Sequence, residues 1–207
     1  LIAYELDSIL QIADPHDVYS NYMQIAQLLD TREFDLEPEF FPSYVAKQTV
    51  ADERIQAYRK AFMDDGLAEI LDSATDELDL YRKVCDWGLE RLVFQPTSGR
   101  DLSPLDITTS SYLGRCEEMQ ILFVAAARTV GLPARPASAP WWAHQDNNHA
   151  WAEVWLDGAW HYTADMDAAY FPDQTWFSGL IDKTVLILAY GSLASSNRYD
   201  CIELLCV

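Results

Sequence analysis

The sequence predicts an α+β fold, with a helical N-terminal half followed by one helix that packs on an antiparallel sheet. Apolar residues recur at helical spacing through the first half of the chain. Beyond Pro133 the spacing falls to two residues, which is the period of a half-buried strand. The dipeptide Asp157-Gly158 separates two alternating runs and is a strong signal for a β-hairpin.

The charge of the chain excludes two classes of partner. Its 207 residues include 33 acidic and 14 basic side chains, for a formal net charge of -19. Such a chain lacks the clustered Lys and Arg that bind nucleic-acid phosphates, and anionic lipid headgroups repel it. No apolar run approaches the roughly 18 residues of a membrane span, so we expect neither nucleic acid as a partner nor membrane insertion. Aromatic residues make up 13% of the chain, which excludes an acidic disordered protein.

Three stretches of the first half have the spacing of amphipathic helices. The first, at about 17–29, has an apolar stripe formed by Val18, Tyr22, Ile25 and Leu29. The second covers about 44–63, and the third, with an acidic first turn, covers about 75–92. We therefore assign 1–95 to a helical region packed on the core and 96–207 to the core itself, together forming one compact unit.

The strongest helical signal begins at Cys116. Its apolar stripe is formed by Met119, Leu122, Phe123, Ala126, Ala127 and Val130. Gly131 is placed to cap the C-terminus, and Pro133 prevents the helix from continuing. The preceding stretch 95–104 is rich in turn residues and reads as a loop.

The clearest alternation lies at 149–156 and predicts a strand with two different faces. The aliphatic face is formed by Ala150, Ala152, Val154 and Leu156, and the other face by His149, Trp151, Glu153 and Trp155. The return strand of the hairpin is 159–163, and 185–190 and 199–206 are further candidate strands.

Cys116 and His149 are candidates for a nucleophile and its base. A thiol at a helix N-terminus feels the positive end of the helix dipole, which together with Arg115 favours the nucleophilic thiolate. Glu117 and Glu118 oppose that effect. His149 opens a strand shortly afterwards, where its imidazole could accept the thiol proton.

Two carboxylates follow the return strand, Asp165 and Asp167, and either could orient the imidazole. A histidine pair, His144 and His149, could suggest a metal, but no third ligand has suitable spacing. The sequence therefore indicates neither a metal nor a cofactor.

Four motifs in order resemble the core of the transglutaminase-like superfamily over about 103–177. They are Gly114-Arg115-Cys116-Glu117-Glu118, Ala127 to Arg135, Asn148 to Trp155, and Gly158-Ala159-Trp160. That superfamily contains transglutaminases, peptide N-glycanases and many bacterial cysteine proteases. The resemblance implies a papain-like fold and a Cys-His-Asp triad.

Carried over by position, Cys116 matches the nucleophile and His149 the base. The acid of the family usually stands four residues after the tryptophan of the return strand, where this chain has Ala164. A two-residue hairpin loop would put even-numbered residues of the return strand on the His149 face, whereas a longer loop or a bulge would put Asp165 and Asp167 there. We prefer Asp165, which needs the smaller displacement, and keep Asp167 as the alternative.

Several groups are candidates for contacting the substrate. The backbone N–H of Cys116 would be one oxyanion donor, and a second would come from Gln95, Ser110 or Tyr112. Trp141 and Trp142 precede His149 and would form an aromatic wall of the cleft or, alternatively, a core anchor for the loop. We take Trp141, Trp142 and Tyr112 as the substrate-binding candidates.

The predicted function is a cysteine-dependent hydrolase, or an acyl-transferase, that acts on amide bonds of peptide or protein substrates through a thioester. The displaced acid motivates an alternative, a degenerate module that holds a peptide or glycan in an aromatic cleft. A third hypothesis is an interaction scaffold built on the helical half. A start at Leu1 and a protease-like core suit a bacterial protein exported to the periplasm or outside with its signal removed, although a reactive thiol suits a reducing cytoplasm equally.

Overall fold

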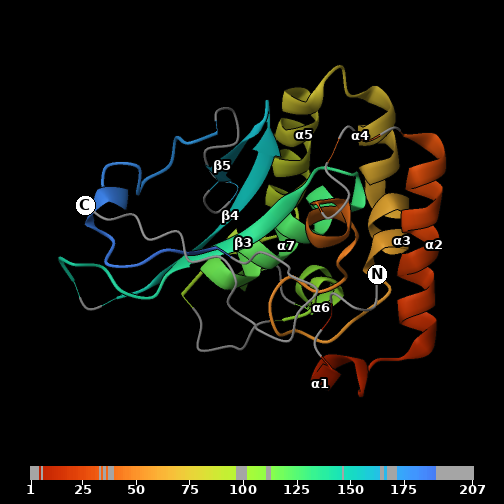
Figure 1. Ribbon diagram of the computed structural model, residues 1–207, viewed down its shortest axis with the longest axis horizontal. Helices are drawn as coiled ribbons and strands as arrows, with labels where there is room; N and C mark the ends of the chain where they lie inside the picture. Colours follow the sequence, from red (N-terminus) through yellow and green to blue (C-terminus); the bar gives the residue numbers. More distant parts are fainter. Residues whose placement is uncertain are drawn as a thin grey trace.

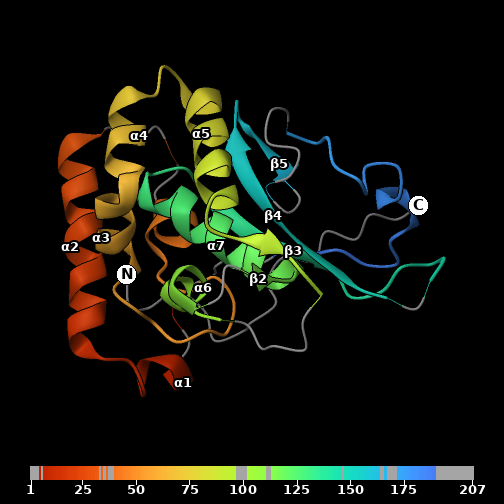
Figure 2. The ribbon, with the colours of Figure 1, turned by 180° about the vertical axis from the view of Figure 1, so that it is seen from behind.

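The computed structural model of the chain confirms the α+β class and places one central helix between a helical layer and a sheet (Figures 1 and 2). It describes residues 5, 7–32, 34, 36, 40–96, 102–110, 113–145, 147–163, 166 and 172–189. In this part of the chain, no helix is both long and apolar enough to span a membrane.

The helical region consists of short elements with local caps. In chain order these are α1 (Asp7–Leu10), α2 (Pro15–Thr31), η2 (Pro42–Ala46), α3 (Tyr58–Phe62), η3 (Met63–Leu67), α4 (Ala68–Ser73) and α5 (Glu77–Leu89). The helices predicted at about 17–29 and 75–92 are confirmed as α2 and α5. Each begins after an aspartate, Asp14 or Asp76, whose side chain accepts a hydrogen bond from a backbone N–H of the first turn.

The helix predicted over about 44–63 is wrong in its middle, because the segment between η2 and α3 is not helical. Two buried carboxylates bind the backbone there. Glu5 accepts a hydrogen bond from the backbone N–H of Gln48 at 2.5 Å, and Glu53 accepts one from that of Val50 at 2.6 Å. Side-chain acceptors that satisfy backbone donors compete with helix formation, and here they prevail.

The apolar stripe predicted on α2 is only partly correct. Ile25 is buried, but the side chains of Tyr22 and Leu29 are 49% and 50% exposed. Asn21 is buried in the same helix and donates a hydrogen bond from Nδ2 to the carbonyl of Gln56 at 2.6 Å. A polar anchor therefore sets the orientation of α2, and apolar spacing alone does not reveal it.

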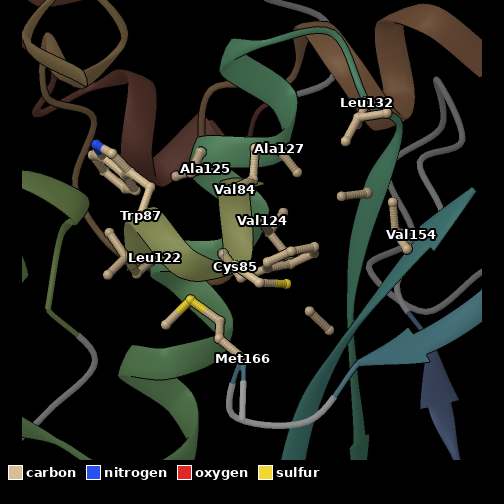
Figure 3. Packing of buried hydrophobic residues seen from close by; sticks show 14 of the residues in the cluster. Val84, Cys85, Trp87, Leu122, Val124, Ala125, Ala127, Leu132, Val154 and Met166 are labelled. Atoms are coloured by element: carbon tan, nitrogen blue, oxygen red, sulfur yellow. The ribbon is translucent and has the colours of Figure 1, made fainter. Parts of the chain in front are cut away.

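The central helix α7 (Cys116–Thr129) is confirmed and is buried on every side from Glu118 onward. It is preceded by α6 (Pro104–Ser110), a short helix that was not predicted. Gly131, with φ of 85°, follows its end as predicted. One hydrophobic cluster contains residues of α3, α5, α7 and the sheet, so both halves of the chain share it. Figure 3 shows part of this cluster.

Four antiparallel strands form the main sheet in the order β5-β4-β3-β6. They are β3 (Ala134–Ala139), β4 (His149–Leu156), β5 (Ala159–Thr163) and β6 (Leu188–Ala189). A second, parallel pair joins β1 (Val93–Phe94) to β2 (Leu113–Gly114). β3 was not predicted, since its alanines, proline and serine give no alternating pattern, and the candidate strand at 199–206 lies outside the described residues.

The predicted hairpin between β4 and β5 is confirmed, and its loop has two residues, one of the two alternatives that the sequence left open. Leu156 pairs with Ala159, and the loop residues Asp157 and Gly158 both have positive φ, at 51° and 79°. Such angles match the twist of the adjoining strands. The aliphatic face of β4 packs against α7, and the face that carries His149 contributes to a second cluster of buried side chains.

The return strand β5 ends at Thr163. Thr163 is buried and pairs with Ala152 of the aliphatic face of β4, and Met166 lies in the cluster around α5 and α7 (Figure 3). Residues three apart in a regular strand point to opposite faces, yet these two share one face. The register of the hairpin therefore cannot be extended past Thr163 by parity.

Candidate active site

The sulfur of Cys116 lies at the N-terminus of α7, where the helix is capped by its own third residue. Glu118 Oε2 accepts a hydrogen bond from the backbone N–H of Arg115 at 3.0 Å. The Cys116 side chain is partly exposed, in contrast to the buried Cys85. The helix dipole therefore acts on a thiol that solvent can reach.

Cys116 and His149, the two catalytic residues predicted from the sequence, line one cavity of about 830 Å³. Its other described lining residues are mainly apolar. They are Leu89, Leu92, Val93, Phe94, Pro96, Arg115, Glu117, Met119, Asn147, Asn148 and Trp176. Cys116 begins α7 and His149 begins β4, and α7 packs along β4 and β3.

The ring of His149 is enclosed by aromatic side chains. Trp142 and Trp151 lie nearly parallel to it, with ring centroids 6.5 Å and 6.1 Å away. Trp176 and Phe177 meet it at steep angles, each with a centroid distance of 4.9 Å. His149 is consequently only 5% exposed although it lines the cavity.

This burial lowers the pKa of His149 to about 4, while the negative charge of Glu117 acts in the opposite direction. The imidazole is therefore neutral at pH 7 and able to accept a proton. Its Nε2 atom is buried and has no hydrogen-bond partner in the described part of the chain.

Glu117 lies directly beside the thiol. Sγ of Cys116 donates a hydrogen bond to Oε2 of Glu117 at 3.1 Å, and Nε of Arg115 lies 3.1 Å from the same oxygen. The Glu117 side chain is 23% exposed and lines the cavity. The sequence indicated Glu117 only as a charge that opposes the thiolate, and its hydrogen bond to the sulfur depends on rotamers that a sequence pattern does not show.

The remaining predicted site residues are placed as follows. Asp165, Asp167 and Tyr112 lie outside the described residues, so the orienting acid and the tyrosine stay predictions. The two-residue loop is the alternative that puts even-numbered residues of β5 on the His149 face, but that register ends at Thr163. The backbone N–H of Gln95 donates to the carbonyl of Gly114 at 2.7 Å.

The two predicted wall residues, Trp141 and Trp142, differ in environment. Trp142 is 1% exposed and packs against the His149 and Phe177 rings, and Trp141 is 55% exposed. Neither residue is among the described residues that line the cavity. The tryptophan that does line it is Trp176, which is 56% exposed. Sequence reasoning missed Trp176, because it lies far along the chain from both Cys116 and His149 and has no local motif.

The mouth of the cavity has an apolar edge that was also missed. Val93 and Phe94 of β1 are 59% and 49% exposed and lie among the lining residues. Both residues come directly after the helix predicted over about 75–92. In the sequence they therefore look like the end of that helix and give no sign of a strand. Among the residues that the structure describes, no three His, Cys, Asp or Glu side chains are grouped as a metal site.

Comparison with known proteins relates the chain to one family. The family model of the transglutaminase-like superfamily matches residues 65–177, more than half of the chain. This match begins within the helical region, ahead of the boundary predicted at 96. A search of the curated proteins finds no match.

Two solved structures are similar to the chain. A proposed cysteine protease from Cytophaga hutchinsonii has a TM-score of 0.51 and 16% identity, over 64% of this chain and 44% of that one. A TGase has a TM-score of 0.40 and 16% identity, over 72% of this chain and 38% of that one. The chain thus spans less than half the length of either structure, and only the first similarity supports the fold.

Proposed function

Because the chain belongs to the transglutaminase-like superfamily, we propose that it is a cysteine-dependent hydrolase or acyl-transferase that acts on amide bonds of peptides or proteins. The observation that carries the proposal is the shared cavity of Cys116 and His149. A thiol at a helix N-terminus that shares a cavity with a neutral imidazole has the groups needed for a nucleophile and its base.

The reaction divides into two steps. The Cys116 thiol transfers its proton to His149, and the sulfur attacks the amide carbonyl carbon, forming a C–S bond. The imidazolium then protonates the amide nitrogen as the C–N bond breaks, which releases the amine and leaves a thioester. Water, or a second amine, attacks the thioester carbon and gives up a proton as the C–S bond breaks, so that the free thiol returns.

The cavity lining supports a substrate that presents an apolar side chain. Leu89, Val93, Phe94 and Trp176 give an apolar surface beside the sulfur. The charged groups among the described lining residues are Arg115 and Glu117, which pair with each other. Although the whole chain is strongly acidic, these two charges have opposite signs. The described lining therefore gives no reason to expect a basic substrate.

Alkylation gives a direct test that needs no known substrate. The protein is treated with iodoacetamide between pH 6 and 8, and adducts at Cys116 and Cys85 are quantified by mass spectrometry. Cys85 is an internal control, because burial raises its pKa to about 12. We expect Cys116 to label at least tenfold faster, since the thiolate is the reactive form. Equal labelling would contradict an activated thiol.

Turnover is tested with peptides whose amide bonds are flanked by Leu or Phe, in water and with an added primary amine. C116S and H149F should each lower turnover at least a hundredfold while the variants remain folded. The amine separates hydrolysis from transfer by the mass of the product. If C116S kept the wild-type rate, the proposal would fail.

We propose a binding module as the second candidate function. It is favoured by the buried Nε2 of His149, which has no hydrogen-bond partner among the described residues, and by the hydrogen bond of the Cys116 thiol to Glu117. It predicts that the same peptides bind to the wild type and to C116S with equal affinity and without turnover. Calorimetry with both proteins distinguishes the two functions.

A further inference from the structure

We propose that Glu117 is a positioning residue that holds the Cys116 thiol in a protonated resting state, and that the thiol must leave this carboxylate to reach His149. The inference rests on the proposed function, since it assigns a role at the same site. The observation behind it is the hydrogen bond from Sγ to Oε2 of Glu117 at 3.1 Å.

The geometry makes the carboxylate and the imidazole competitors for one proton. A thiol has a single hydrogen, and Oε2 of Glu117 lies within hydrogen-bond distance of the sulfur. His149 lines the same cavity, and its buried Nε2 has no hydrogen-bond partner among the described residues. Rotation about the Cα–Cβ bond of Cys116 is the movement that would exchange one partner for the other.

The charges around the sulfur determine the direction of the effect. A carboxylate that accepts from a thiol stabilises the protonated form, and its negative charge disfavours the thiolate. Arg115 would favour the thiolate, but its Nε is paired with the same Glu117 oxygen at 3.1 Å. Glu118, whose Oε2 lies 3.7 Å from that Nε, adds a further negative charge.

Other elements bring few charges to this site. In the part of the chain that the structure describes, β4 contributes only the neutral His149 to the cavity lining. The edge formed by β1 contributes Val93 and Phe94, which carry no charge. The negative charge of Glu117 has two opposite effects on transfer of the proton. It disfavours the thiolate of Cys116, and it favours the imidazolium of His149 once the proton has moved.

The test is the pH dependence of Cys116 alkylation in the wild type, E117Q, E117A and E117D. E117Q removes the negative charge beside the sulfur, so its profile should move about one pH unit lower, with about tenfold faster labelling at pH 6. E117A should move at least as far, and E117D, which keeps the charge, should stay near the wild type.

E90Q is the matched control. Glu90 is 78% exposed and its removal changes the net charge by the same amount. Its profile should not move, because a solvent-exposed charge is screened. The inference would be overturned if the profiles of E117Q and E117A lay within 0.3 pH units of the wild type. Such a shift corresponds to about a twofold change in the rate of labelling. An equal shift in E90Q would also overturn it.

A second readout separates positioning from a merely structural role. Since the Glu117 charge raises the His149 pKa against burial, E117Q should lower that pKa below its value of about 4, as followed by NMR titration of the imidazole. Alkylation and titration need no turnover. Failure of the Glu117 role therefore leaves the proposed function standing, whereas wild-type turnover in C116S would remove the function itself.

Discussion

Nδ1 of His161 lies 2.7 Å from Oδ2 of Asp173, and this contact fastens the turn after residue 172 to strand β5. The other carboxylate oxygen of Asp173 accepts a hydrogen bond from the backbone N–H of Tyr162 at 2.9 Å. The turn carries Trp176 and Phe177, both of which contact the ring of His149. A histidine without any signal in the sequence thus helps to hold the wall of the candidate site.

Replacing Asp173 should loosen that wall. D173A removes both interactions of the carboxylate and puts alanine at φ of 64°, so the free energy of unfolding should fall by about 2–3 kcal/mol. D173N should cost about 1 kcal/mol, because Asn tolerates this φ and keeps one acceptor. Urea denaturation measures both, and equal losses would contradict the carboxylate's role.

The buried His149 should make stability depend on pH. In the unfolded chain its pKa is near the ordinary 6.5, and in the folded protein it is about 4. Between these values the unfolded state binds more protons, so the free energy of unfolding falls as the pH drops below 6.5 and levels off below about 4. The loss is roughly 3 kcal/mol in total and about 2 kcal/mol at pH 5.

H149F tests this linkage, because phenylalanine suits the aromatic surroundings and does not titrate. Urea denaturation at pH 7.5 and pH 5 should show that the wild type loses about 2 kcal/mol more than H149F. Other groups titrate in both proteins and cancel in the comparison. Identical losses would show that His149 is not buried in its neutral form.

Gly88 should tolerate a side chain poorly, although it lies inside helix α5. A Cβ atom there would come 2.1 Å from Sδ of Met166, which is buried in the cluster shown in Figure 3. Alanine normally favours a helix by about 1 kcal/mol over glycine, but the overlap should make G88A less stable than the wild type by about 1–3 kcal/mol.

The double variant G88A/M166A separates the two effects. Shortening Met166 removes the overlap, so the added cost of G88A should be much smaller in the M166A background than in the wild type. G179A is the control, since nothing lies within 4 Å of its added Cβ. Thermal denaturation of these variants and of the wild type measures the losses in stability. Additive losses would mean that Met166 does not occupy this position.

Arg128 joins the end of α7 to the start of β3 and to the distant segment at Thr49. Its Nε donates to the carbonyl of Ala134 at 2.9 Å, and its Nη1 donates to that of Thr49 at 2.7 Å. R128M should lose about 3 kcal/mol, because buried carbonyls are left without donors. R54M, at an exposed ion pair with Asp106, should lose under about 1 kcal/mol. A similar loss in both variants would contradict the buried role.

Local patterns were sufficient for several elements. The start of α7 at Cys116, its end before Gly131, and the hairpin around Asp157-Gly158 depend on neighbours in the sequence. Helix periodicity, strand alternation and turn chemistry act over a few residues, so they can be recognised without knowing the fold. The same neighbourhood contains the motifs that relate the chain to its family.

The sequence by itself determined the α+β class, the family resemblance, and the choice of Cys116 and His149. Only the tertiary structure decided how the two residues are surrounded. The aromatic ring around His149 includes Trp176 from a distant turn, and Glu5 keeps the chain near Gln48 out of a helix. Burial, hydrogen bonding and pKa depend on groups that are far apart in the chain and meet only when the core closes, so no local pattern contains them.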